Sequence, residues 1–480
     1  MSVYKKFTKD VGLITFVHFL TVAKIIIFMP LITKMLGAFS YGIWTQLLVT
    51  AGLVAPLMRL GLTNSIVRYL SSEKDAQEIK KGIYSVLLVV VIMSFFIFAG
   101  FIAFLKPISS FFQSPTIFIF LLPFIISLES LNATMLSVFQ AFQKMTTYSL
   151  LVVFSSLGEI GLVIASIYLG YGLEGAVFSL LLIRIMTFAL LYAHIYMIAG
   201  FGLPEFTLLK KYLKFSLPTL LSNISYWFVT SIDKYLVGFF LGTLFVGYYA
   251  PAYSLGNLIT FFILPISFVL FPAVSKSYDE QKIDQVRTKL RYSLKYFLVI
   301  AIPAVFGMSV LTQSLLEIFT TKEIALQGLL VTPFIALSIL FYGASDVFSQ
   351  ILTLVKKTKI VGVTWALAAL LNIMLNLFLI PSLGIFGAAL ATLAAYLFAF
   401  LLIWHYSFKE LAFTIDWQVI VKIILCSAAM SVLVFTISPH GLLMTIVTIA
   451  VSAVLYGILI LLTKVFAQKE LSFLKDLVKR

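Results

Sequence analysis

The sequence predicts an all-α integral membrane protein with about fourteen transmembrane helices, arranged as two six-helix lobes followed by two further helices. Three observations support this prediction: an apolar composition, regularly spaced apolar runs and an internal repeat. Hydrophobic residues fill 61% of the 480 positions, charged residues fill 11%, and the mean hydropathy is +1.10. Soluble domains carry about 25% charged residues. A chain of this composition buries its apolar surface in a lipid bilayer.

The fourteen predicted helices are runs of about 17 to 25 mostly apolar residues, the length that crosses the hydrocarbon core of a membrane. We expect them at 11–33, 41–63, 83–105, 116–138, 149–170, 174–198, 215–241, 247–274, 294–315, 325–354, 360–380, 384–406, 417–437 and 442–463. The first run is longer than a signal-peptide core and lacks a small-x-small cleavage site, so we expect it to remain as the first span.

The positions of lysine and arginine predict the orientation, because cytoplasmic loops are enriched in both residues. With the N-terminus placed inside, 26 of the 34 Lys and Arg residues fall in inside segments, three in outside loops and five within spans. Both termini are therefore expected in the cytoplasm of a multi-pass protein of the cell membrane. The net charge of +15 is explained by this asymmetry, and we assign no nucleic-acid role.

Two short segments repeat at equivalent places. Residues 36–44 (LGAFSYGIW) match 241–249 (LGTLFVGYY), and residues 172–177 (GLEGAV) match 384–389 (GIFGAA). Similar offsets and an even number of intervening helices indicate a parallel repeat of a six-helix block. The expected divisions are an N-terminal lobe 1–200, a basic cytoplasmic connector 201–214, a C-terminal lobe 215–406, and two extra helices with a basic tail, 407–480.

Several ionisable residues lie within the predicted spans, where they normally face a bundle interior or a wet cavity. The candidates for substrate binding are Lys24, Arg59, Arg184, Asn223, Tyr226, Thr230, Lys234 and Tyr342. The candidates for ion coupling or structural charge are His18, Glu129, Glu159, Asp233 and Asp346.

Several of these candidates also have a structural explanation. Arg59 and Arg184 are near enough to an expected boundary to extend their side chains to water. The structural explanation for Lys24 is an interhelical salt bridge. Asp233 and Lys234 are expected not to pair with each other, because adjacent helical residues point about 100° apart. Lys234 shares one side of its helix with Thr230.

Catalytic and metal motifs are scarce. The chain has one cysteine, Cys426, and no His-Glu-x-x-His, Asp-x-Asp or phosphate-binding Gly-Lys-Ser/Thr motif. We therefore expect no enzyme activity, metal or cofactor, and a driving force that comes from an ion gradient, the substrate gradient or a partner.

The segment 231–249, with Ser-x-Asp-Lys, Leu-Gly and Val-Gly-Tyr-Tyr, resembles the start of the second lobe in the polysaccharide-transport branch of the multidrug/oligosaccharidyl-lipid/polysaccharide exporter superfamily, which contains Wzx-like O-antigen flippases. The segment 59–69 (RLGLTNSIVRY) is similar to that family's end of helix two. The resemblance implies a two-lobe transporter that flips a lipid-linked oligosaccharide by alternating access. Membrane lipids and polysaccharide assembly proteins are the implied partners.

Three alternatives stay open at this point. A peptidoglycan-precursor flippase is related to this family and carries chemically similar cargo. A cation-coupled multidrug exporter has the same fold but favours buried carboxylates, and here the spans hold five Lys/Arg against four Asp/Glu. A membrane glycosyltransferase or polymerase belongs to a different class and generally presents acid, base or metal groups at one surface.

Overall fold

The computed structural model describes residues 3–466, and those residues form helices and connections without a strand. Within that range, the structure describes only the backbone of residues 3–11, 18, 22, 218–219, 221–226, 264 and 268–269. In the described part, twelve helices are long and apolar enough to cross a membrane. The predicted all-α membrane fold is confirmed, whereas the exact number of fourteen spans is not.

The predicted number of spans, fourteen, exceeds the twelve found in the described part because of two helices. Helix α1 (Val3–Arg59) runs through the first two predicted spans, and its helical geometry breaks at Gly37, which has φ 83° and ψ 173°. Helix α8 (Phe206–Leu241) contains the predicted span 215–241 but is not among the twelve. The figure of fourteen therefore stays a prediction.

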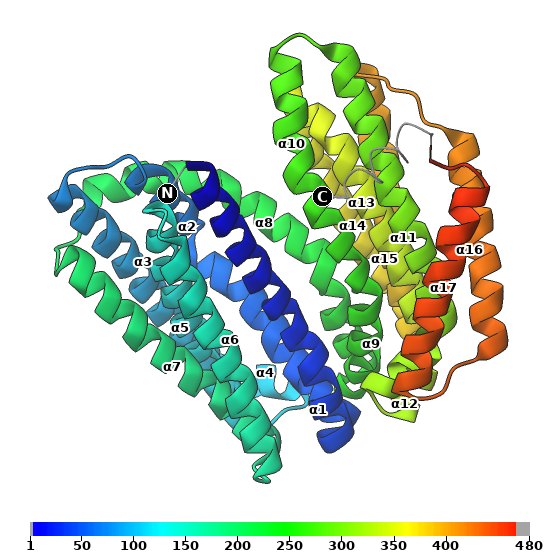
Figure 1. Ribbon diagram of the computed structural model, residues 1–480. Coiled ribbons are helices and arrows are strands. Elements are labelled where there is room, and N and C mark those ends of the chain that lie inside the picture. The colour runs from blue at the N-terminus through cyan, green and yellow to red at the C-terminus, as the bar shows by residue number, and fades with distance from the viewer. Residues whose placement is uncertain (1–2, 467–480) are drawn as a thin grey trace. The chain divides into compact units, whose positions relative to one another are not determined.

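The chain divides into two compact units, Met1–Gly247 and Tyr248–Arg480 (Figure 1). The helices between α1 and α8 in the first unit are α2 (Leu62–Leu70), α3 (Ala76–Ala103), α4 (Leu105–Phe112), α5 (Thr116–Ala141), α6 (Met145–Tyr168) and α7 (Gly172–Ala199). Helix α1 packs against α5, α6 and α8, while α7 packs against α5 and α6. By its contacts α8 belongs to this unit, and the lobe boundary at 215 stays a prediction.

The second unit contains most of α9 (Thr243–Gly256) and all later helices. These are the 3-10 helix η1 (Asn257–Phe262), α10 (Ile263–Asp279), α11 (Ile283–Phe319), α12 (Lys322–Gly328), α13 (Val331–Leu354), α14 (Thr358–Leu383), α15 (Ile385–Glu410), α16 (Trp417–Ile437) and α17 (Leu442–Leu462). Helix α15 packs against α13 and α14, and α11 packs against α10, α13 and α16. Helices α16 and α17 pair with each other and correspond to the two extra helices expected at 417–437 and 442–463 (Figure 1).

The matched segments of the repeat share an unusual backbone conformation. Gly37 and Gly242 have φ 83° and 94°, and Gly172 and Gly384 have φ 58° and 62°. A positive φ strongly favours glycine, because the Cβ of other residues clashes with the backbone. The same left-handed conformation at matched positions supports the internal repeat inferred from the sequence.

Two copies of the Leu-Gly segment also contact each other within the first unit. A Cβ built on Gly42 would lie 2.1 Å from the carbonyl oxygen of Thr243, and a Cβ on Gly247 would lie 1.9 Å from the carbonyl oxygen of Ala38. Gly42 is equivalent to Gly247 in the repeat, and Ala38 to Thr243. The contact is therefore reciprocal, as in a two-fold interface, and brings backbone directly against backbone.

Candidate functional site

A charged cluster lies inside the helix bundle of the first unit. The Glu159 carboxylate on α6 accepts hydrogen bonds from Lys24 Nζ on α1 and from Arg184 Nη1 on α7, both at 2.9 Å. Arg184 Nη2 lies 3.5 Å from Glu129 Oε2 on α5. The Glu159 side chain is 3% exposed, against 12% for Arg184 and 19% for Lys24. Four helices thus bring together residues that the sequence identified only one by one.

The position of Glu159 follows from the pattern of α6. Ser156, Glu159 and Val163 are buried at spacings of three and four residues, which places them on one face of the helix. A buried carboxylate is costly unless cations and hydrogen bonds compensate it. Two charge-assisted hydrogen bonds provide this compensation, so the interhelical salt bridge considered for Lys24 is present.

Arg59 is the least constrained cation in this region. It lies at the C-terminal end of α1, is half-buried, and interacts electrostatically with Glu129. In the described part of the protein, its guanidinium forms no hydrogen bond or ion pair. Its five N–H donors are consequently available to an anion. Together with Lys24 and Arg184, it gives the cluster three basic side chains against two carboxylates.

Among the described residues, three buried polar atoms on α5 and α7, one of them on Arg184 itself, lack a hydrogen-bond partner. The Asn132 amide nitrogen donates to the Arg184 carbonyl oxygen at 3.0 Å. The buried atoms Arg184 Nε, Asn132 Oδ1 and Thr187 Oγ1 have no hydrogen-bond partner in the described part. Buried polar groups are normally paired. The helices α5 and α7 therefore present unused donor and acceptor capacity beside the charged cluster.

The charged pair on α8 corrects one prediction. Lys234 Nζ lies 3.2 Å from Asp233 Oδ1, so the two side chains do pair with each other. The long lysine side chain folds back toward the start of its helix, where Nζ also donates to the Thr230 carbonyl at 3.0 Å. The 100° separation of the Cβ atoms does not prevent contact, because four methylene groups span it. Both side chains are buried.

The remaining candidates on this part of the chain have different outcomes. Thr230 is half-buried, and its hydroxyl donates to the Trp227 carbonyl oxygen at 3.1 Å. His18, Asn223 and Tyr226 have side chains outside the described residues, so their roles stay predictions.

In the second unit, Tyr342 and Asp346 lie one turn apart on α13. Tyr342 packs edge-on against Trp365 and Tyr396, at centroid distances of 5.7 and 5.9 Å. Trp365 and Tyr396 are themselves 5.7 Å apart. Asp346 accepts a hydrogen bond from Ser267 on α10. Three aromatic rings thus meet between α13, α14 and α15, while the half-buried Asp346 carboxylate of α13 contacts α10.

The sequence reasoning missed a buried amide pair on α14. Asn376 Nδ2 donates to Asn372 Oδ1 at 2.9 Å, and Asn372 Nδ2 lies 3.5 Å from the Thr392 hydroxyl of α15. All three side chains are fully buried, and Asn376 Oδ1 has no partner among the described residues. Two asparagines four residues apart in an apolar run were the available signal. The described residues contain no group of three or more His, Cys, Asp or Glu that would hold a metal ion.

Curated relatives match part of the chain. The chain is 24% identical over 212 residues to "Probable low-salt glycan biosynthesis flippase Agl15" of Haloferax volcanii, covering 44% of this chain and 45% of that protein. It is 30% identical over 178 residues to "Probable flippase AglR" of the same organism, covering 36% and 37%. The matches therefore span less than half the length of these relatives.

Solved structures match the fold along most of the chain. The structure titled "Lipid II flippase MurJ, inward closed conformation" superposes with a TM-score of 0.77 at 20% identity, covering 98% of this chain and 100% of that one. An inward-facing multidrug resistance MATE family transporter superposes with a TM-score of 0.64 at 17% identity, covering 82% and 94%. These likenesses establish a shared architecture.

Family models match both halves of the sequence. The model described as "Polysaccharide biosynthesis protein" matches residues 7–278, and the MatE model matches residues 218–378. The first match covers more than half of the 480 residues. The chain therefore belongs to the polysaccharide biosynthesis protein family and has the fold of the multidrug/oligosaccharidyl-lipid/polysaccharide exporters.

Proposed function

We propose that this protein moves a lipid-linked oligosaccharide, carried on a polyprenyl phosphate or pyrophosphate, across the cytoplasmic membrane by alternating access. The observation that carries the proposal is the charged cluster of the first unit, where Lys24 and Arg184 form ion pairs with Glu159 and Glu129 within membrane-spanning helices. Arg59 adds a third basic side chain, which interacts electrostatically with Glu129. Membership of the polysaccharide biosynthesis family and similarity to proteins named as flippases support it.

The cluster suits an anionic headgroup. Each intramembrane charge costs roughly 2.5 to 3.5 kcal/mol on insertion scales, so a set of five is retained for a function or for mutual pairing. Glu159 compensates the buried charges of Lys24 and Arg184 through direct ion pairs. Arg59 is left with unused donors, and a guanidinium matches the oxygens of a phosphate in a bidentate geometry. We assign Arg59 to the phosphate, with Lys24 and Arg184 maintaining the positive potential around it.

The second unit offers groups that suit sugar rings. The faces of aromatic side chains pack against apolar ring surfaces, while carboxylates accept hydrogen bonds from hydroxyls. Tyr342, Trp365 and Asp346 provide such groups. Lys234 is buried against Asp233, so we assign this pair to the stability of the first unit in the conformation described.

The orientation is part of the same proposal. With both termini in the cytoplasm, the basic segments 64–82, 201–214 and 276–295 face the cytoplasm, as the positive-inside rule requires. A substrate assembled on the cytoplasmic leaflet would then be delivered to the outer one.

The rival function on the same fold is a cation-coupled multidrug exporter, which the MatE match and the MATE structures fit. The excess of basic over acidic side chains in the cluster favours an anionic substrate instead. A membrane glycosyltransferase or polymerase is the alternative of a different class.

Mass spectrometry of lipid-linked intermediates in a strain that lacks this protein tests the proposal. We expect the complete, unpolymerised oligosaccharide unit to accumulate on its lipid, and the wild-type protein to clear it. Truncated units would indicate an enzyme of assembly, and unchanged intermediates with increased drug sensitivity would indicate the multidrug exporter. Arg59→Lys, which keeps the charge, and Arg59→Gln, which removes it, are the matched pair for complementation.

A further inference from the structure

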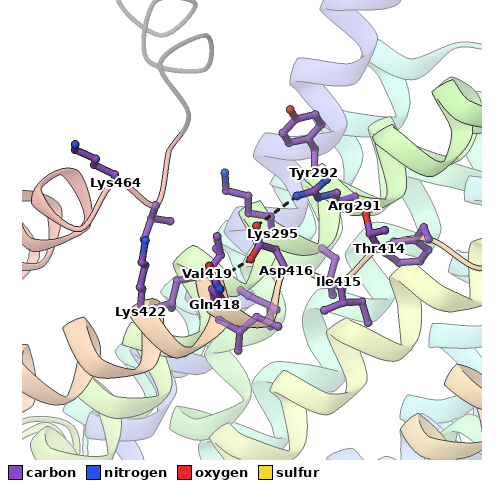
Figure 2. A pocket seen from close by; sticks show the side chains of 16 residues that line it. Arg291, Tyr292, Lys295, Thr414, Ile415, Asp416, Gln418, Val419, Lys422 and Lys464 are labelled. Carbon is purple, nitrogen blue, oxygen red and sulfur yellow. Dashed lines mark hydrogen bonds and ion pairs between the residues drawn. The ribbon is translucent and has the colours of Figure 1, made fainter.

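A pocket of about 280 Å³ lies in the second unit (Figure 2). It is formed by the first part of α11, the connection 411–416, the start of α16 and the residues that follow α17. Four of its lining side chains are basic, namely Arg291, Lys295, Lys422 and Lys464, while Asp416 is the acidic one. None of the candidate residues predicted from the sequence lines this pocket.

Both oxygens of the acidic side chain are engaged. Asp416 Oδ1 accepts a hydrogen bond from the Val419 N–H at 3.2 Å and so caps the N-terminus of α16. Asp416 Oδ2 accepts from Arg291 Nη2 at 3.3 Å, the ion pair drawn in Figure 2. One carboxylate therefore offsets one guanidinium and leaves a net positive pocket.

The three lysines line the pocket from three different segments of the chain. Lys295 comes from α11, and its ammonium lies 5.4 Å from the centroid of the Phe466 ring. Lys422 comes from the second turn of α16, and Lys464 follows α17. In the described part, the ammonium groups of Lys422 and Lys464 form no hydrogen bond or ion pair. Cations that share a pocket repel each other, and an anion placed between them removes that cost.

From the positions of the candidate membrane spans, we expect this pocket at the depth of the phospholipid headgroups. It sits at the ends of candidate membrane spans, since α16 begins at Trp417 and α17 ends at Leu462. The N-terminus of α16 adds the positive end of its dipole. Its two basic α11 residues, Arg291 and Lys295, belong to the predicted inside segment 276–295, which carries six Lys/Arg residues. Phospholipid headgroups occupy this depth of a membrane.

We propose that this pocket is a binding site for a phosphate group, presented either by the headgroup of an acidic phospholipid or by free phosphate. A bound phosphate would join α11, α16 and the end of α17 through the four basic side chains. The site is separate from the charged cluster of the first unit, and its occupancy does not depend on the transported substrate.

The test uses the purified full-length protein and two probes. Phosphatidylglycerol binding is measured by native mass spectrometry, with phosphatidylcholine as the zwitterionic reference, and inorganic phosphate binding is measured by calorimetry. Removing two lysine charges, in the double variant Lys422→Gln/Lys464→Gln, is expected to weaken binding roughly 30-fold, the effect of two basic residues at an anionic lipid surface. The control Lys356→Gln/Lys359→Gln removes the same charge outside the pocket and is expected to leave the affinity unchanged.

A third variant is expected to strengthen phosphate binding instead of weakening it. Asp416→Asn keeps a capping side chain but removes the negative charge and releases Arg291, so phosphate binding should tighten roughly fivefold. A variant that merely loosened the fold would weaken binding, not strengthen it. Selective binding of phosphatidylglycerol identifies a lipid headgroup as the source, and selective binding of inorganic phosphate identifies a soluble one. Absence of both, or equal affinities for the pocket and control variants, would overturn the proposal.

Discussion

Glu159 connects two cations on different helices, so removal of its charge is the most informative single change in the first unit. In Glu159→Gln, Lys24 and Arg184 each lose a 2.9 Å charge-assisted hydrogen bond while staying largely buried. Breaking a buried ion pair by removing one partner costs about 3 to 5 kcal/mol. We expect a loss near 3 kcal/mol in the free energy of unfolding, because Arg184 retains Glu129 and Lys24 is partly exposed.

Glu129→Gln is the matched control, since it makes the same chemical change in the same cluster. The Glu129 carboxylate lies 3.5 Å from Arg184 and its side chain is 38% exposed. Solvent screens such a pair, so its removal should cost at most about 1 kcal/mol. The free energy of unfolding would be measured by denaturant titration of the detergent-purified variants. An effect of Glu159→Gln no larger than that of Glu129→Gln would refute the assignment of Glu159 as the centre of the cluster.

Further variants test the other packing and charge assignments. Gly247→Ala places a Cβ 1.9 Å from a backbone carbonyl oxygen and should lower the free energy of unfolding by about 1 to 3 kcal/mol. The control Gly362→Ala, whose Cβ meets nothing within 4 Å, should not lower it. Thermal denaturation compares the two variants. Lys234→Met removes the ammonium group bonded to buried Asp233 and should destabilise more than the double change Lys234→Met/Asp233→Leu, in a denaturant series. Arg59→Gln should change the free energy of unfolding by no more than about 0.5 kcal/mol. It should lower the transport rate about 10- to 100-fold, which is the effect of losing one charged hydrogen-bonding group. Arg59→Lys keeps the charge and should retain more transport activity than Arg59→Gln.

Much of the fold was predictable because the bilayer imposes a simple length and composition rule. The predicted span 417–437 coincides with α16, and 442–463 differs from α17 by one residue. The helices α8 and α11 extend beyond their apolar runs into basic segments that hydropathy alone assigns to loops. The repeat was readable because positive φ at Gly37 and Gly242 constrains the residue type.

The charged residues of the candidate site could be recognised singly in the sequence, but their pairing could not. The sequence indicates that Lys24 and Glu159 are costly in a membrane, but they lie 135 positions apart, and only packing of α1 against α6 brings them together. The prediction that Asp233 and Lys234 do not pair was wrong, because helical geometry gives the directions of the Cβ atoms and not the reach of a flexible side chain. Asn372 and Asn376 were overlooked because neutral amides leave a weak signal in an apolar run.

Transport of a lipid-linked oligosaccharide by the purified protein tests the central claim most directly. The protein would be reconstituted in vesicles that hold a polyprenyl pyrophosphate-linked oligosaccharide, and the arrival of the sugar at the opposite leaflet would be measured by its accessibility to a sugar-modifying enzyme. We predict transfer by the wild-type protein, a large loss in Arg59→Gln, and partial recovery in Arg59→Lys. Wild-type vesicles that transfer a cationic dye but no lipid-linked oligosaccharide, or equal transfer by Arg59→Gln, would contradict the account.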